Sequence, residues 1–204
     1  MESLYFRTFI GLPLRLDQQM LQARSDLINA LEGERISWVD PGRFHVTLRF
    51  LGDTEASLVK EIGRALCSGV TLPGITGLEF SGLSSFGPRK RPRVVWAGFE
   101  KNDFFELLKN EVDQILKECG IALEKQPFRA HLTLGRVRNL RNLQRYYEII
   151  EEMNIHFRRR VLFESLVFYR SIPGRGGPEY HVLDEIPFQQ DINPSGSQSR
   201  HHPS

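Results

Sequence analysis

PGRFHVTL, residues 41–48, returns 86 residues later as PFRAHLTL, residues 127–134. Five of the eight positions are identical, namely Pro, Arg, His, Thr and Leu, so the two segments are interpreted as an internal repeat. The same offset places Asp17 on Asp103, each at the head of a predicted helix. Each half of the chain therefore reads strand, helix, His-x-Thr strand, helix, strand.

This duplication predicts an α+β fold of two lobes related by a pseudo-two-fold axis. Each lobe is expected to be a mostly antiparallel sheet with helices on its outer face, and the active-site cleft is expected between the lobes. Residues 1–190 are predicted to form one domain, and the polar segment 191–204 is predicted to be a disordered tail.

Apolar periodicity and capping residues predict the individual elements. The predicted strands cover residues 4–12, 44–51, 77–86, 93–99, 128–136, 156–170 and 179–187. The predicted helices cover residues 17–32 with Asp17 as N-cap, 55–68, 103–119 closed by Gly120, and 140–153.

The composition is that of a globular protein with a sizeable core. Of 204 residues, 40% are hydrophobic and 25% are charged, whereas a disordered chain has fewer apolar residues. The 27 Lys and Arg nearly balance the 25 Asp and Glu, leaving a net charge of +2. This balance argues against a strongly non-specific, polybasic nucleic-acid binder, although local basic patches remain compatible with it.

The sequence favours a cytoplasmic protein without a membrane segment. No apolar run approaches the roughly 18 residues of a membrane span. The first residues are interrupted by Arg7 and Arg15 and show no cleavage site of a secretory signal. The two cysteines, Cys67 and Cys119, are too few for a disulfide framework or a zinc site, and we interpret them as buried free thiols.

The repeated motif places two polar side chains on one face of each strand. Residues i and i+2 of a strand point to the same side, so His45 lies beside Thr47, and His131 beside Thr133. The intervening apolar residues point to the opposite side, toward the helices. Two such lobes facing each other would bring two imidazoles and two hydroxyls into one cleft.

Two histidines across a cleft suit acid–base catalysis. An imidazole titrates near pH ~6.5, so one ring can accept a proton from water while the other donates one to a leaving oxygen. The threonine hydroxyls can donate to phosphoryl oxygens. Acidic residues are not clustered near either motif, so we expect neither a metal nor another cofactor. A single His-x-Thr would more often be structural, but duplicated polar positions on one face are hard to explain by packing.

The two motifs, HVTLRFLG at 45–52 and HLTLGR at 131–136, resemble those of the two-histidine (2H) phosphoesterases. More specifically, the chain resembles the RNA 2′,3′-cyclic phosphodiesterases, also called the LigT-like or 2′-5′ RNA ligase family, over roughly residues 4–188. Trp38, the segment PRVVWAG at 92–98 and the closing stretch from Ser165 to Tyr180 support this narrower resemblance. Ala130 departs from it, because the family commonly has proline there.

The resemblance implies hydrolysis of a 2′,3′-cyclic phosphate at an RNA 3′ end to leave a 2′-phosphate. By analogy, His131 is assigned as the proton acceptor for water and His45 as the proton donor for the 3′ oxygen. The family name also implies a reversible 2′-5′ joining activity. The implied partner is an RNA or oligonucleotide end bearing the cyclic phosphate, and we expect a monomer without an obligate protein partner.

Three arginines and one phenylalanine are candidate substrate-binding residues. Arg136 matches the arginine that follows the family's second motif, but strand parity puts it off the His131 face unless Gly135 introduces a bulge. Arg43 and Arg129 share the histidine faces, with solvated strand-end arginines as the alternative. Strand parity also places Phe50 off the face that carries His45 and Thr47. Phe50 is therefore interpreted either as a core residue or as a residue that stacks on a base.

Two basic runs, Arg89-Lys90-Arg91 and Arg158-Arg159-Arg160, are interpreted as possible RNA contacts or as solvated surface. His156 and His181 lack a threonine partner and are interpreted as structural. Two further functions stay open alongside the leading one. The chain could be a non-catalytic RNA or nucleotide-binding module, or a phosphodiesterase for small cyclic nucleotides.

Overall fold

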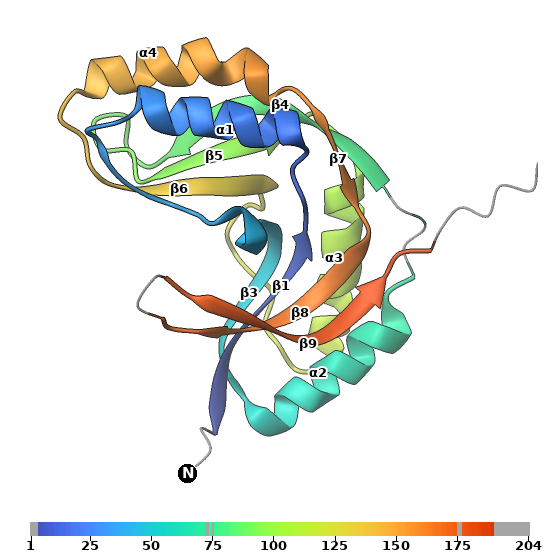
Figure 1. Cartoon of the computed structure of the whole chain (residues 1–204). Helices are drawn as coiled ribbons and strands as arrows, with labels where there is room; N and C mark the ends of the chain where they lie inside the picture. Colours follow the sequence, from blue (N-terminus) through green and yellow to red (C-terminus); the bar gives the residue numbers. More distant parts are fainter. Residues whose placement is uncertain (1–3, 72–73, 75, 175–176, 190–204) are drawn as a thin grey trace, which may run out of the picture.

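The two histidine strands lie at the centre of a curled antiparallel sheet (Figure 1). In the computed structural model of the chain, which describes residues 4–71, 74, 76–174 and 177–189, the strand order is β7-β4-β5-β6-β3-β1-β8-β9, with β2 paired to β6. The strands are β1 (Tyr5–Pro13), β2 (Arg35–Trp38), β3 (His45–Glu55), β4 (Thr76–Phe86), β5 (Val94–Phe99), β6 (His131–Asn139), β7 (Arg160–Phe163), β8 (Ser165–Ile172) and β9 (Glu179–Pro187).

Four helices lie in the described part of the chain, and only some of them begin at a side-chain cap. They are α1 (Gln18–Ala30), α2 (Ala56–Gly69), α3 (Phe104–Glu118) and α4 (Leu143–Met153). The Asp17 carboxylate accepts a hydrogen bond from the Met20 N–H at 2.7 Å, which confirms the predicted cap of α1. Asp103, its equivalent in the repeat, makes no side-chain cap bond to α3. Gly120 follows α3 with a φ of 81°, a conformation that favours glycine.

The pseudo-two-fold axis of the fold passes between the two motifs. β3 and β6 are joined through the antiparallel pair Val46–Leu132, whose members are separated by the 86-residue repeat offset. The three inner strands of each lobe follow the same order, because β4, β5 and β6 correspond to β8, β1 and β3 under that offset. We call β3, β1, β8 and β9 the first lobe, and β6, β5, β4, β7 and β2 the second lobe. The predicted α+β fold with two related lobes is confirmed.

The two halves of the sequence do not each build their own lobe. α1 follows a strand of the first lobe but packs beside α4, which covers the second lobe (Figure 1). α3 follows a strand of the second lobe but packs against α2 and β3 of the first. β2 and β4 of the first half lie in the second lobe, and β8 and β9 of the second half lie in the first lobe. Each lobe therefore contains pieces of both repeats.

The core lies between the sheet and these helices. The motif residues that alternate with His and Thr, namely Val46, Leu48, Leu132 and Leu134, are buried there, as the strand pattern predicts. Cys67 is exposed and Cys119 is half-buried, so the expectation that both thiols are buried is wrong. Over the described part of the chain, no helix combines the length and the apolar character needed to cross a membrane.

Several predicted boundaries differ from the structure. The strand expected at 128–136 begins only at His131 and runs to Asn139. The strand expected at 156–170 is divided into a 3-10 turn at Asn154–Phe157 and the strands β7 and β8. β2 was not predicted, because its four residues are too few to show a pattern. The expected tail at 191–204 lies outside the described residues.

Candidate active site

His45 and His131 are the first residues of β3 and β6. The Val46–Leu132 pair holds the two strand starts side by side, so both histidines and both motif threonines line one cavity of about 280 Å3. The cavity, which we call the cleft, is lined by Ser37, Trp38, Val39, Arg43, His45, Thr47, Phe50, Phe86, Val94, His131, Thr133, Arg136, Arg138, Gly177, Pro178 and Tyr180. The constellation predicted from the repeat is thus brought together at the junction of the lobes.

Each histidine is fixed by the backbone in the same way. His45 Nδ1 lies 2.8 Å from the carbonyl oxygen of Arg43, and His131 Nδ1 lies 2.7 Å from that of Arg129. A carbonyl oxygen only accepts, so in both rings Nδ1 carries the hydrogen and donates it. Nε2 is therefore the nitrogen left in each ring for proton exchange with a substrate.

Aromatic side chains surround both imidazoles and lower their affinity for protons. The His45 ring lies 4.9 Å from Phe9 and 5.1 Å from Tyr180 between ring centres. The His131 ring lies 4.7 Å from Phe86, edge to face. Burial lowers the pKa of both histidines below the usual value, and the Arg136 cation lowers both further. Burial and the Arg136 cation thus both oppose protonation of the two rings, while the backbone hydrogen bonds to Arg43 and Arg129 favour it.

Arg136 and Phe50 reach the cleft because each motif strand contains a bulge. In β6, Gly135 pairs with Val95 and Thr133 pairs with Trp96, so Leu134 is an extra residue. In β3, Leu48 is skipped in the same manner between the pairs of Thr47 and Arg49 with β1. The bulges lie at equivalent positions of the repeat and reverse the parity after them. The parity argument against these two cleft residues is therefore wrong, and the bulge lies one residue before Gly135.

Comparison with known proteins identifies the family of the chain. The sequence pattern described as LigT like Phosphoesterase matches residues 10–96 and 101–180. This chain belongs to the LigT-like phosphoesterase family. The predicted membership of that family is confirmed.

Two relatives of the chain carry the same name. The chain is 34% identical over 155 residues to the RNA 2′,3′-cyclic phosphodiesterase of Aeropyrum pernix, covering 76% of this chain and 87% of that protein. It is 29% identical over 187 residues to the RNA 2′,3′-cyclic phosphodiesterase of Thermotoga maritima, covering 90% and 96% of the two chains.

Solved structures share the fold. A Thermus thermophilus protein superposes with a TM-score of 0.66 at 21% identity, over 91% of this chain and 99% of that one. E. coli LigT complexed with 3′-AMP gives a TM-score of 0.62 at 20% identity, with the same coverage. The likeness to these two structures shows that they and this chain share one fold.

The two arginines that precede the LigT-like motifs occupy different places. Arg43 lines the cleft, and its Nη1 donates to the carbonyl oxygen of Pro178 at 3.1 Å, which connects the first motif to the β8–β9 connection. Arg129 does not line the cleft. Its guanidinium stacks on Trp96 at 4.8 Å from the ring centre, and Trp96 in turn contacts His131.

Several cleft residues were not predicted as site residues. Ser37 and Trp38 belong to β2. Phe86 is the last residue of β4, and Pro178 directly precedes β9. Arg138 is the exception that the sequence could have revealed, because it lies two residues after Arg136 and shares its face of β6. Its Nε donates to Ser37 Oγ at 3.1 Å, which ties β2 to the cleft wall.

His156, His181 and Tyr169 lie away from the LigT-like cleft, whereas Tyr180 lines it. His156 is exposed in a 3-10 turn rather than in the strand predicted for it, and His181 is exposed on β9. Tyr180 lines the cleft, whereas Tyr169 stacks behind it on Phe9 at 4.8 Å. Within the described ranges, no three His, Cys, Asp or Glu side chains gather as metal ligands.

Proposed function

We propose that this protein hydrolyses the 2′,3′-cyclic phosphate at an RNA 3′ end to a 2′-phosphate, without a metal ion. The observation that carries the proposal is the matched pair of imidazoles, each with Nδ1 donating to a backbone carbonyl and Nε2 left for the cleft they share. Membership of the LigT-like family and the names of the relatives support the same substrate class.

The reaction needs one proton acceptor and one proton donor. Nε2 of His131 takes a proton from water as the water oxygen bonds to phosphorus, and Nε2–H of His45 gives a proton to the 3′ oxygen as its bond to phosphorus breaks. The 2′ oxygen keeps the phosphate. Thr47, Thr133 and Arg136 line the cleft where they can donate hydrogen bonds to the non-bridging oxygens as negative charge grows there.

The direction of proton flow follows the assignment made by analogy with the family, because the surroundings of the two rings are alike. Burial is the largest cause that lowers both pKa values, and two cationic groups act on each ring, Arg129 and Arg136 on His131, and His131 and Arg136 on His45. A substrate that needs no protonation of its leaving group distinguishes the two roles.

The direct test incubates the protein with an oligoribonucleotide that ends in a 2′,3′-cyclic phosphate, in the presence of EDTA. We expect a 2′-phosphate product, and we expect His45→Ala and His131→Ala each to reduce kcat by about 100- to 10,000-fold. A 3′-phosphate product would contradict the proposal. Full turnover in either variant, or loss of turnover in EDTA, would contradict the mechanism.

The polarity of the pair is tested with a cyclic substrate whose 3′ oxygen is replaced by sulfur. A thiolate leaves without protonation far more readily than an alkoxide, because a thiol has a pKa near ~8.5. We expect the sulfur substrate to restore turnover to His45→Ala but not to His131→Ala. Restoration of His131→Ala alone would reverse the two assignments.

Other aspects of the proposed function follow from the same site. Attack of a 5′-hydroxyl in place of water on the cyclic phosphate gives a 2′-5′ joined product through the same residues. Because one chain supplies both histidines, we propose that the protein acts as a single-domain monomer. We also propose that it acts in the cytoplasm. Binding of a 2′-phosphorylated nucleotide without any turnover would favour a binding module instead, and equal rates on mononucleotides would favour small cyclic nucleotides as substrates.

A further inference from the structure

A second cavity, of about 580 Å3, adjoins the cleft, and basic residues dominate its lining. We call it the basic groove. Its charged lining residues are all cationic, namely Lys90, Arg91, Arg93, Arg136 and Arg138. The remaining lining residues are neutral, namely Pro92, Val94, Val137, Asn139, Leu140 and Leu143. No acidic side chain offsets these five positive charges within the groove wall.

The basic groove adjoins the cleft and shares part of its wall. Val94, Arg136 and Arg138 line both cavities. The wall is held by backbone bonds, because Val94 pairs with Arg136 across β5 and β6 and the Val137 N–H donates to the carbonyl oxygen of Arg93 at 2.9 Å. A chain whose end lies at the histidines can therefore pass into the groove over these shared residues.

The other half of the cleft has a different chemistry. The repeat offset relates Arg136 to Phe50 and Arg138 to Gly52. Around His45 the walls are aromatic, with Phe9 and Tyr180 against the ring and Phe50 exposed at 58% of its surface. The duplicated strands have thus diverged after their motifs, because Phe50 can stack on a base where Arg136 can neutralise a phosphate.

A cyclic phosphate closes the 3′ end of its strand. Every other phosphodiester of the RNA lies on the 5′ side of it, so the strand leaves the cleft in one direction only. Electrostatics favours the exit that carries the cations. The basic groove has the required sign of charge and shares three lining residues with the cleft.

We propose that the basic groove binds the phosphodiester backbone of the nucleotides 5′ to the cyclic phosphate, so that the protein prefers single-stranded RNA ends to mononucleotides. This inference rests on the proposed function. Lys90, Arg91 and Arg93 form the part of the groove beyond the cleft and contact only the longer substrate. Arg136 and Arg138, which line both cavities, contact either substrate.

The test compares a 2′,3′-cyclic mononucleotide with an oligoribonucleotide of about four nucleotides that ends in the same cyclic nucleotide. The variant is Lys90→Gln/Arg91→Gln/Arg93→Gln, which removes three charges without touching the histidines. We expect kcat/KM on the oligonucleotide to fall by about 10- to 100-fold, through KM, while the mononucleotide changes less than about twofold. The slope of log kcat/KM against log salt should flatten by about 2.

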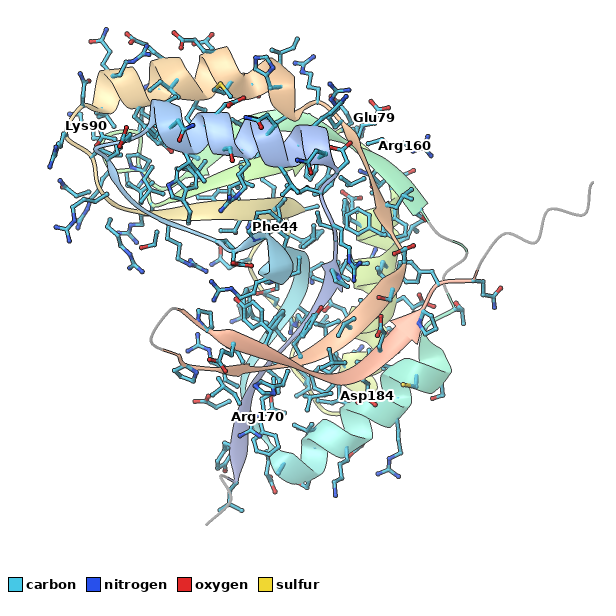
Figure 2. The ribbon with its side chains drawn as sticks, in the orientation of Figure 1. Phe44, Glu79, Lys90, Arg160, Arg170 and Asp184 are labelled. Atoms are coloured by element: carbon cyan, nitrogen blue, oxygen red, sulfur yellow. The ribbon has the colours of Figure 1, made fainter. Side chains whose placement is uncertain are left out.

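The chain offers a matched control in Arg158→Gln/Arg159→Gln/Arg160→Gln, which removes three charges outside the groove. Figure 2 shows Lys90 and Arg160 at opposite sides of the molecule. We expect this control to leave both substrates and the salt slope unchanged. Equal losses in the control would show that overall charge is responsible and would overturn the inference. An unchanged rate of the groove variant on the oligonucleotide, or an equal loss on both substrates, would also overturn it.

Failure of the proposed function is distinguishable from failure of this inference. If the wild-type protein turns over neither substrate, the proposed function fails, and fluorescence anisotropy with the same oligonucleotide then tests the groove alone. A loss of affinity of about tenfold in the groove variant, relative to the control variant, would support the groove. Equal affinity in the two variants would reject it.

Discussion

Arg136 lies where one guanidinium influences both imidazoles. Burial lowers the pKa of His45 and of His131, and the Arg136 cation lowers both pKa values further because it disfavours a second positive charge nearby. The same residue lines the cleft where the phosphate is expected. Its charge therefore acts on the substrate and on the protonation of the two rings.

Arg136→Gln is expected to move the pH profile of kcat/KM to higher pH. Removing the cation makes each imidazolium easier to form, so the pKa of both histidines rises, and both limbs of the bell-shaped profile follow them. We also expect KM to rise by about tenfold, because one charged hydrogen bond to phosphate is lost. Steady-state rates measured from about pH 4.5 to about pH 9 on a cyclic mononucleotide give both quantities.

Arg138→Gln is the comparison for this measurement, since it removes the same charge two residues further along β6. We expect Arg138→Gln to raise KM but to shift the two limbs of the pH profile by less than Arg136→Gln does. If Arg136→Gln lowers activity but leaves the profile in place, Arg136 acts on the substrate alone.

At the scale of the elements, the repeat predicted the site better than it predicted the strands around it. His45, Thr47, His131 and Thr133 share the cleft because strand parity holds over the three residues of each motif. Parity fails beyond Leu48 and Leu134, where each strand inserts a bulge. A bulge is defined by pairing with β1 or β5, and that pairing is not visible in the bulged strand's own sequence.

Arg49 shows what the reversed parity does on the other face of β3. Its side chain is 5% exposed and forms ion pairs with Asp113 of α3 at 3.6 Å and with Glu124 at 3.3 Å. Its guanidinium also donates to the carbonyl oxygen of Ala122. Lys109 completes the cluster through Asp113 at 2.6 Å. The cluster thus connects the strand of the first motif to the segment that leads to His131.

Arg49→Met is expected to lower the free energy of unfolding by about 3 kcal/mol, because it leaves two partly buried carboxylates with one cation instead of two. The segment before His131 loses an anchor, so kcat should fall by more than KM changes. Urea unfolding, monitored by circular dichroism, measures the free energy of unfolding. Steady-state kinetics measures the changes in kcat and KM separately.

Arg145→Met provides the matched control for that variant. Arg145 pairs with Glu148 at 3.7 Å and with Glu152 at 3.4 Å, but its side chain is 52% exposed. We expect a change of less than about 1 kcal/mol and normal kinetics. Equal destabilisation in the two variants would mean that burial of the Arg49 cluster contributes little to stability.

At the scale of the molecule, the lobes are connected by exchange of elements. The repeat predicted two similar lobes correctly, yet it could not show that α1 and α3 cross to the opposite lobe. The sequence of an amphipathic helix does not indicate which sheet the helix covers, because its apolar face can pack against any apolar surface of suitable shape. The exchange is decided by tertiary packing, and it makes neither sequence half complete without the other.

This exchange predicts that both lobes unfold in one cooperative transition. Trp38 and Trp96 lie in the second lobe, on β2 and β5, so their fluorescence reports that lobe, whereas circular dichroism reports all the helices. Ile62, fully buried on α2 of the first lobe, is the site to perturb. Ile62→Ala should lower the melting temperature by about 10 °C in both signals equally, because the cavity destabilises the shared native state. A shift in circular dichroism with an unmoved tryptophan transition would show instead that the lobes unfold independently.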